Sequence, residues 1–111
     1  MNPIKMGIVV TSLFALTAFA DAPDKKTERS WKAKCAACHG ADGKGDTEQG
    51  KKANVADMTA KAWQSAHPDD EMAKTIKEGS KKNDKHGDMD AYDLPAEDIA
   101  KLVAMVRTFA K

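Results

Sequence analysis

The chain has 111 residues, which is enough for one small domain and too few for a multidomain enzyme. Its 18 Lys and Arg residues nearly balance 17 Asp and Glu residues, so the net charge of +1 leaves no basic excess with which to bind nucleic acid. Beyond residue 22, only 15 side chains are large and apolar or aromatic. A core this thin needs a further stabilising element, such as a disulfide, a metal or a cofactor.

The first 22 residues have the pattern of an export signal. A short polar start with one lysine is followed by an apolar run from Met6 to Ala20, and Ala20 and Ala22 have the small-x-small spacing of a cleavage site. The run is shorter than the roughly 20 residues that a membrane span requires. We therefore predict a signal peptide at residues 1–22 and a soluble, exported domain at residues 23–111. Retention of the segment as an uncleaved anchor is the alternative.

The first predicted helix runs from about Asp24 to Ala37 and leads into the sequence C-x-x-C-H, formed by Cys35, Cys38 and His39. Residues three apart share one face of a helical turn, so both thiols can reach the two vinyl groups of a single porphyrin and form thioethers. The imidazole beside these attachment points can then approach the iron. The glycine-rich stretch at 40–45 is too flexible to continue the helix. The motif thus predicts one covalently bound haem c, with His39 as an iron ligand.

Three other uses of the same residues fit the sequence less well than haem attachment. A thioredoxin-like redox pair would need alternating strands and helices, and no β-branched run in the sequence resembles a strand. A zinc site would combine Cys35, Cys38, His39 and His86 with irregular spacing. A disulfide between the two cysteines would close too short a loop to stabilise the chain much. Haem attachment is therefore the preferred interpretation.

Two further helices are predicted from apolar spacing and from end signals. One spans Pro68 to Glu78, with acidic residues in its first turn and Gly79 as its stop. The other spans Pro95 to Ala110 and carries an apolar stripe of the kind that packs on a core. A short turn is expected near Thr59 to Gln64, with long loops elsewhere. The sequence therefore predicts an all-α fold with three main helices.

The methionines after the motif differ in their surroundings, and this difference bears on a second iron ligand. Met72 and Met105 lie in predicted helices and are expected to pack in the core. Met89 stands in a polar loop and is flanked by aspartates. A thioether in a loop is a soft, neutral donor that can approach haem iron without a helix axis fixing its angle. We expect Met89 to be the second ligand, with Met58 and His86 as alternatives.

From Thr27 to Ala110, the chain resembles small bacterial class I cytochromes c. The resemblance rests on motifs in a fixed order: Trp31, the C-x-x-C-H sequence, Gly40, a D-G-x-G-D loop at 42–46, a D-M-T segment at 57–59 leading to Trp63, I-x-x-G at 76–79, M-x-A-Y at 89–92 and a closing amphipathic helix. It implies a small cytochrome c fold with long loops wrapped around one haem c. Cys35 and Cys38 would hold the haem, and His39 and Met89 would be its axial ligands.

The resemblance also bears on Trp63 and on function. Trp63 resembles a residue that lines the pocket or donates its indole N–H to a haem propionate; a core aromatic is the alternative. The family implies a periplasmic, monomeric one-electron carrier that exchanges electrons with redox protein partners and is not an enzyme. No nucleic-acid partner and no stable membrane insertion are expected. The alternative is a haem protein whose distal site opens, acting as a ligand sensor or as the electron-entry domain of an enzyme.

The chain departs from the family pattern at four positions. Asp90 stands where Pro commonly follows the axial Met, which predicts a looser distal loop. Residues 51–55 lack the Pro whose carbonyl orients the proximal histidine, so the sequence does not predict what restrains His39. Thr27 and Met105 replace a Gly and an aromatic residue where the first and last helices cross, so a different spacing is expected there.

Overall fold

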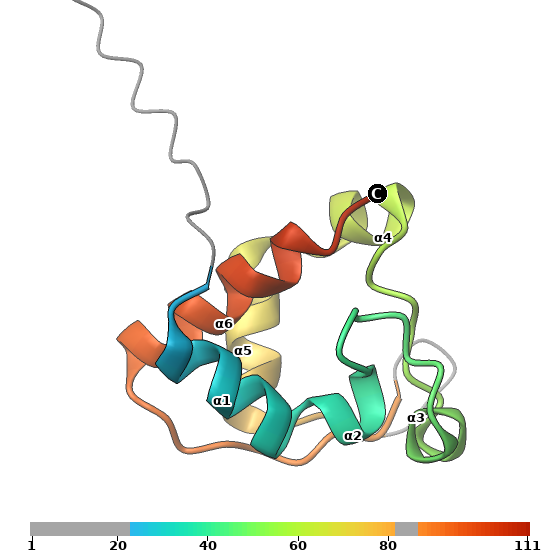
Figure 1. The fold of residues 1–111 in the computed structure, drawn as a ribbon, viewed down its shortest axis with the longest axis horizontal. Coiled ribbons are helices and arrows are strands. Elements are labelled where there is room, and N and C mark those ends of the chain that lie inside the picture. Colours follow the sequence, from blue (N-terminus) through green and yellow to red (C-terminus); the bar gives the residue numbers. More distant parts are fainter. Residues whose placement is uncertain (1–22, 82–86) are drawn as a thin grey trace, which may run out of the picture.

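The computed structural model describes residues 23–81 and 87–111 of the chain (Figure 1). The predicted signal peptide at 1–22 and His86, one of the alternative ligands, lie outside the described residues. The described part forms helices α1 (Lys25–Lys34), α2 (Ala36–His39), α3 (Glu48–Ala53), α4 (Lys61–Ala66), α5 (Asp69–Glu78) and α6 (Ala96–Thr108). This part contains no strand, only an isolated bridge between Ser80 and Met89, so the predicted all-α class is confirmed. None of its helices has the length and apolar character needed to span a lipid bilayer.

The helix predicted from Asp24 to Ala37 is divided at Cys35. Asp24 caps α1, because its carboxylate accepts a hydrogen bond of 2.7 Å from the backbone N–H of Thr27. The backbone N–H of Cys35 still donates to the carbonyl of Trp31 at 2.8 Å, but the φ of Cys35, −117°, departs from the helical value of about −63°. The chain therefore turns at Cys35 before α2 begins, and the prediction of one continuous helix is wrong at this point.

Helix α3 is absent from the sequence-based prediction. It begins after Thr47, whose hydroxyl accepts a hydrogen bond of 2.8 Å from the N–H of Gly50, and it ends at Asn54, which has a left-handed φ of 57°. A side chain at Gly50 would collide with the backbone carbonyl oxygens of Cys38 and Gly45. Helix α3 was not predicted because it contains a glycine and has no apolar stripe. Its capping residues, Thr47 and Asn54, are types that commonly end helices.

The other helices agree with the prediction more closely. Helix α5 begins after Pro68 and ends at Glu78, where Gly79 takes a positive φ of 74°. Helix α6 lies within the predicted range, starting one residue after Pro95. The turn expected near 59–64 is the short helix α4. Proline and glycine therefore mark the ends of these elements as the sequence suggested.

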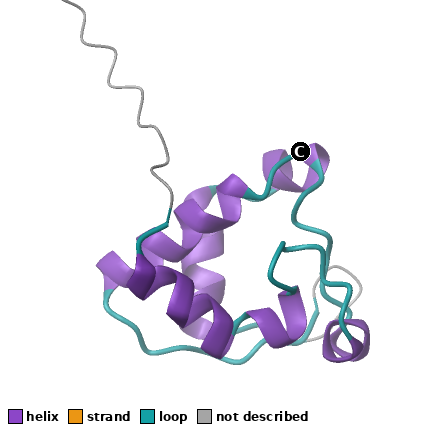
Figure 2. Ribbon diagram, viewed as in Figure 1, coloured by secondary structure: helices purple, strands orange, loops and turns teal. Residues whose placement is uncertain are grey.

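The core of the protein is small and is built mainly around α6. Helix α6 packs against α1 and α5, and these three helices lie on one side of the molecule, with α3 and α4 on the other (Figures 1 and 2). Leu102 is the most buried core residue, at 2% exposure. Thr27 on α1 and Met105 on α6, the two departures at the expected helix crossing, are both buried. The buried apolar residues are Trp31, Met58, Met72, Ile99, Leu102, Val103, Met105 and Val106.

Asp24 predicts how the stability of the protein responds to acid. Hydrogen bonds from Thr27, and to a smaller extent the Lys101 ammonium at 3.2 Å, lower the pKa of its carboxyl from 3.8 to about 2. A carboxyl whose pKa is depressed by folding contributes stability above its unfolded pKa and loses that contribution as the pH falls toward the folded value. We expect Asp24→Asn, which keeps a capping side chain, to unfold at a lower urea concentration than the wild type at pH 6. The difference should shrink as the pH falls from 4 to 2; equal urea midpoints at pH 6 would contradict this role of Asp24.

Candidate functional site

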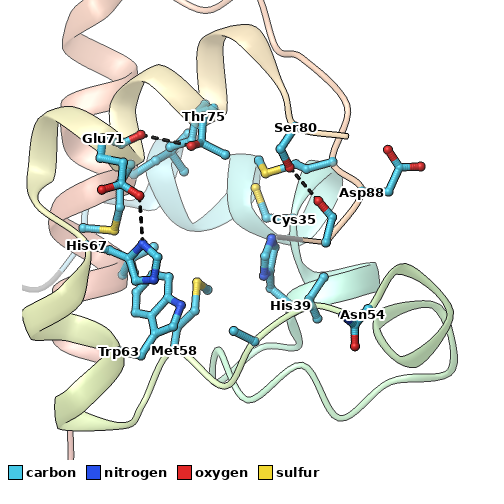
Figure 3. Close-up of a pocket in the computed structure, with 18 of the residues that line it drawn as sticks. Cys35, His39, Asn54, Met58, Trp63, His67, Glu71, Thr75, Ser80 and Asp88 are labelled. Atoms are coloured by element: carbon cyan, nitrogen blue, oxygen red, sulfur yellow. Dashed lines mark hydrogen bonds and ion pairs between the residues drawn. The ribbon is translucent and has the colours of Figure 1, made fainter. Parts of the chain in front are cut away.

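A large cavity lies between the core helices and the loop that follows α3 (Figure 3). It contains about 1040 Å³ free of protein atoms, counting the part open to solvent. Helices α1, α2, α4, α5 and α6 all contribute to its wall. Most of the wall is apolar, formed by Trp31, Val55, Met58, Trp63, Met72, Ile76, Leu102 and Val106.

The two cysteines of the motif lie at one edge of this cavity. Cys35 lines the cavity itself, and Cys38 lines a smaller hollow beside it, which Cys35 also borders. Both are free thiols, so the disulfide considered from the sequence is not formed. Burial raises the pKa of the Cys35 thiol from 9.0 to about 11, and this thiol is therefore protonated at neutral pH.

His39 lies at the end of α2 and borders both the main cavity and the smaller hollow beside it. Its imidazole packs against the indole of Trp31, with 5.8 Å between the ring centroids. Its Nδ1 atom is buried and has no hydrogen-bond partner among the described residues, so none of their carbonyls restrains the ring. Burial lowers the pKa of His39, and the imidazole is therefore neutral at neutral pH. A neutral imidazole is the form that binds metal ions.

The backbone around His39 is held by Trp31. The indole N–H of Trp31 donates a buried hydrogen bond of 3.0 Å to the carbonyl of Gly40, the residue after His39. On the other side, the N–H of Gly45 donates to the carbonyl of His39 at 2.8 Å. Trp31 is only 4% exposed, so it fixes the cysteine motif from inside the core.

Met89 is half-buried and borders both hollows, as His39 does. Its backbone forms an antiparallel bridge with Ser80, with an N–H···O distance of 2.9 Å in one direction and 2.8 Å in the other. The bridge requires close approach, since a Cβ at Gly79 would lie 2.6 Å from the carbonyl oxygen of Met89. The segment that sequence analysis treated as a looser loop is thus hydrogen-bonded to the end of α5.

The opposite part of the wall contains a stacked pair of rings. Trp63 and His67 stack with 4.5 Å between their centroids, and His67 Nδ1 lies 3.1 Å from Glu71 Oε1. Figure 3 shows this pair and His39 on different sides of the cavity, with Met58 beside Trp63. Sequence analysis did not assign His67 and Glu71 to the site, because α4 ends before His67 and α5 begins after it, so no helical spacing links these residues to Trp63.

Arg107 on α6 holds this wall in place, and sequence analysis missed it as well. Its guanidinium donates to the side-chain and backbone oxygens of Gln64 at 2.8 and 2.7 Å, and to the carbonyl of His67 at 2.6 Å. It also donates to the Asp69 carboxylate at 2.8 Å. Gln64 in turn donates to the carbonyl of Met58 at 2.6 Å. One arginine thus joins α6 to both α4 and the start of α5.

The structure brings most of the residues singled out in the sequence to one place. Cys35, His39, Met89 and Trp63 all border the main cavity, and Cys38 lies in the hollow beside it. Met58, considered as an alternative ligand, also borders the cavity and is 5% exposed. Met72 lines the cavity from α5, and Met105 does not.

Replacement of Trp31 tests its link to the cysteine motif. We expect Trp31→Phe to lower the free energy of unfolding by about 1–3 kcal/mol, because the buried carbonyl of Gly40 loses its donor. Urea denaturation of the purified protein measures this effect. The matched control is Trp63→Phe, since Trp63 is half-buried and, among residues 23–81 and 87–111, its indole N–H donates to no carbonyl. The account fails if the two variants lose the same stability.

Comparisons with known proteins agree with this arrangement. The model of the family described as cytochrome c matches residues 25–110. The solved structure of the KustC0563 c-type cytochrome is similar, with a TM-score of 0.64 and 26% sequence identity over 77% of this chain and 98% of that one. No curated protein sequence matches the chain. Because the family model covers most of the chain and the fold agrees with it, this protein belongs to the cytochrome c family, whose members bind haem c covalently and typically carry electrons.

Proposed function

We propose that this protein is a one-electron carrier with one haem c attached through Cys35 and Cys38 and ligated by His39 and Met89. The observation that carries the proposal is the apolar cavity that His39 and Met89 both border, with Cys35 at its edge. His39 and Met89 are far apart in the sequence, and the fold brings them to one place. This is the arrangement that a haem with two protein ligands requires.

The properties of these side chains fit a haem. Both cysteines are free, and the C-x-x-C-H spacing fits two thioethers. His39 is neutral at neutral pH, so it can offer a lone pair to iron. The cavity wall is mostly apolar, and a porphyrin would supply the apolar bulk that the thin core lacks.

The donor set supports electron transfer over catalysis at the iron. When bound, haem c supplies one-electron chemistry between Fe(II) and Fe(III). His39 and Met89 together would occupy both axial positions and leave no site for oxygen or peroxide. The neutral Met89 thioether would favour Fe(II) more than a second imidazole would. We therefore propose a carrier rather than an enzyme.

We also propose a cellular compartment and a class of partners for the protein. The export pattern at residues 1–22 supports a soluble, periplasmic carrier once this segment is removed. Its partners would be redox proteins that donate and accept the electron, met by the protein as a monomer. The near balance of charges argues against nucleic acid as a partner.

Replacement of the two methionines on the cavity tests the ligand set. We expect Met89→Ala to abolish the sulfur-to-iron charge-transfer band of the oxidised holoprotein and to lower its reduction potential, because the soft axial donor is lost. Met58→Ala is the matched control and should keep the band. Visible spectroscopy and redox titration check both variants. Retention of the band in Met89→Ala, with its loss in Met58→Ala, would make Met58 the ligand.

Rapid binding of carbon monoxide to the reduced wild type would instead favour a distal site that opens.

Removal of both attachment thiols tests whether haem completes the core. We expect the Cys35→Ala, Cys38→Ala double variant to lose most of its helical circular dichroism signal, because without haem the cavity is left unfilled. The wild type produced in the same haem-attaching host is the control, and its mass should equal that of residues 23–111 plus one haem. A wild type with the mass of the bare polypeptide would contradict the proposed function. A native helical signal in the double variant would contradict the role of haem in folding.

A further inference from the structure

Residues 87–92, here called the Met89 segment, place few apolar side chains in the core. Asp88 and Asp90, which flank Met89, are both exposed, and Met89 itself is only half-buried. Burial of apolar surface therefore contributes little to fixing this part of the backbone. Hydrogen bonds from the segment to the rest of the protein, together with the close backbone contacts at Gly79 and Gly87, therefore position Met89.

The first group of these bonds joins the segment to the ends of two helices. In addition to the Ser80–Met89 bridge, the Ser80 hydroxyl donates to the carbonyl of Gly87 at 2.7 Å. The N–H of Asp88 donates to the carbonyl of Ala53, at the end of α3, at 3.1 Å. These bonds fix where the segment enters the cavity wall.

Tyr92 provides a different connection, which leads to the cysteine motif. Its hydroxyl donates a hydrogen bond of 2.9 Å to the carbonyl of Lys34, the residue before Cys35. Its backbone N–H donates to the carbonyl of Ile76 on α5 at 2.8 Å. Among the described residues, the Tyr92 hydroxyl makes the hydrogen bond that links the Met89 segment to α1.

The position of Tyr92 suits such a link. Its side chain borders the smaller hollow together with Cys38, His39 and Met89. Burial raises the pKa of its hydroxyl, which is therefore a donor throughout the neutral range. The Tyr92 hydroxyl thus connects the segment that contains Met89, the proposed distal ligand, to the residue before Cys35, a proposed haem attachment site.

We propose that Tyr92 is a positioning residue, whose hydroxyl holds Met89 at a fixed distance from the attachment segment and so keeps its thioether on the iron. This inference rests on the proposed function. Loss of the hydroxyl leaves the aromatic ring and the backbone bond to α5 in place. It should therefore loosen Met89 without removing it.

Competition with an added ligand measures how firmly Met89 is held. Imidazole binds the iron of the oxidised holoprotein only when the thioether leaves, so a looser segment gives a tighter apparent affinity. We expect Tyr92→Phe to bind imidazole between about twofold and tenfold more tightly than the wild type, the range for one lost hydrogen bond. The charge-transfer band should remain, because Met89 is still the ligand in the absence of imidazole.

The matched control is Thr108→Val, which also removes one hydroxyl. The Thr108 hydroxyl donates to the carbonyl of Met105 within α6 at 2.6 Å, and Thr108 does not line the cavity. This variant should lose stability to urea while its imidazole affinity stays at the wild-type value. If imidazole binds Tyr92→Phe no more tightly than the wild type, or if Thr108→Val shows the same gain, the positioning role is overturned.

The spectrum of Met89→Ala separates this inference from the proposed ligand set. A band that survives in Met89→Ala would defeat the ligand assignment, and the positioning role with it. A band that disappears in Met89→Ala, together with unchanged imidazole affinity in Tyr92→Phe, would overturn the positioning role alone.

Discussion

The structure depends on an apolar cavity at the centre of a core that has too few large side chains to fill it. Trp31, Met58, Met72, Leu102 and Val106 belong to the buried core and also line the cavity. The side chains that hold the helices together are therefore the side chains that would contact a bound haem. The proposed haem, attached at the cysteine motif, would therefore stabilise the folded state by completing its core.

Hydrogen bonds to backbone carbonyls help to order the loops around this cavity. The carbonyls on both sides of the cysteine motif accept bonds from side chains, the Gly40 carbonyl from Trp31 and the Lys34 carbonyl from Tyr92. Gly50 and Gly79 allow α3 and the Met89 segment to approach other backbone atoms more closely than a Cβ would permit. The site is thus shaped by contacts that need small residues at specific places.

The sequence predicted those parts of the structure that depend on local chemistry. Helices α5 and α6 carry apolar periodicity and end signals within their own residues. The five residues of the C-x-x-C-H motif are enough by themselves to predict haem attachment. Met89 stood out because a lone thioether in a polar loop is unusual. Helix α3 lacks periodicity, and the turn at Cys35 is a single backbone angle, so neither was predicted. The roles of Arg107 and His67 arise from contacts between distant segments, which one sequence does not reveal.

The network around Arg107 has a consequence for the order in which the molecule can assemble. Arg107 follows every segment that it fastens, so a polypeptide emerging from its amino end cannot complete this wall until α6 is present. The part of the cavity wall that contains Trp63 and His67 is therefore the last part that the growing chain can complete.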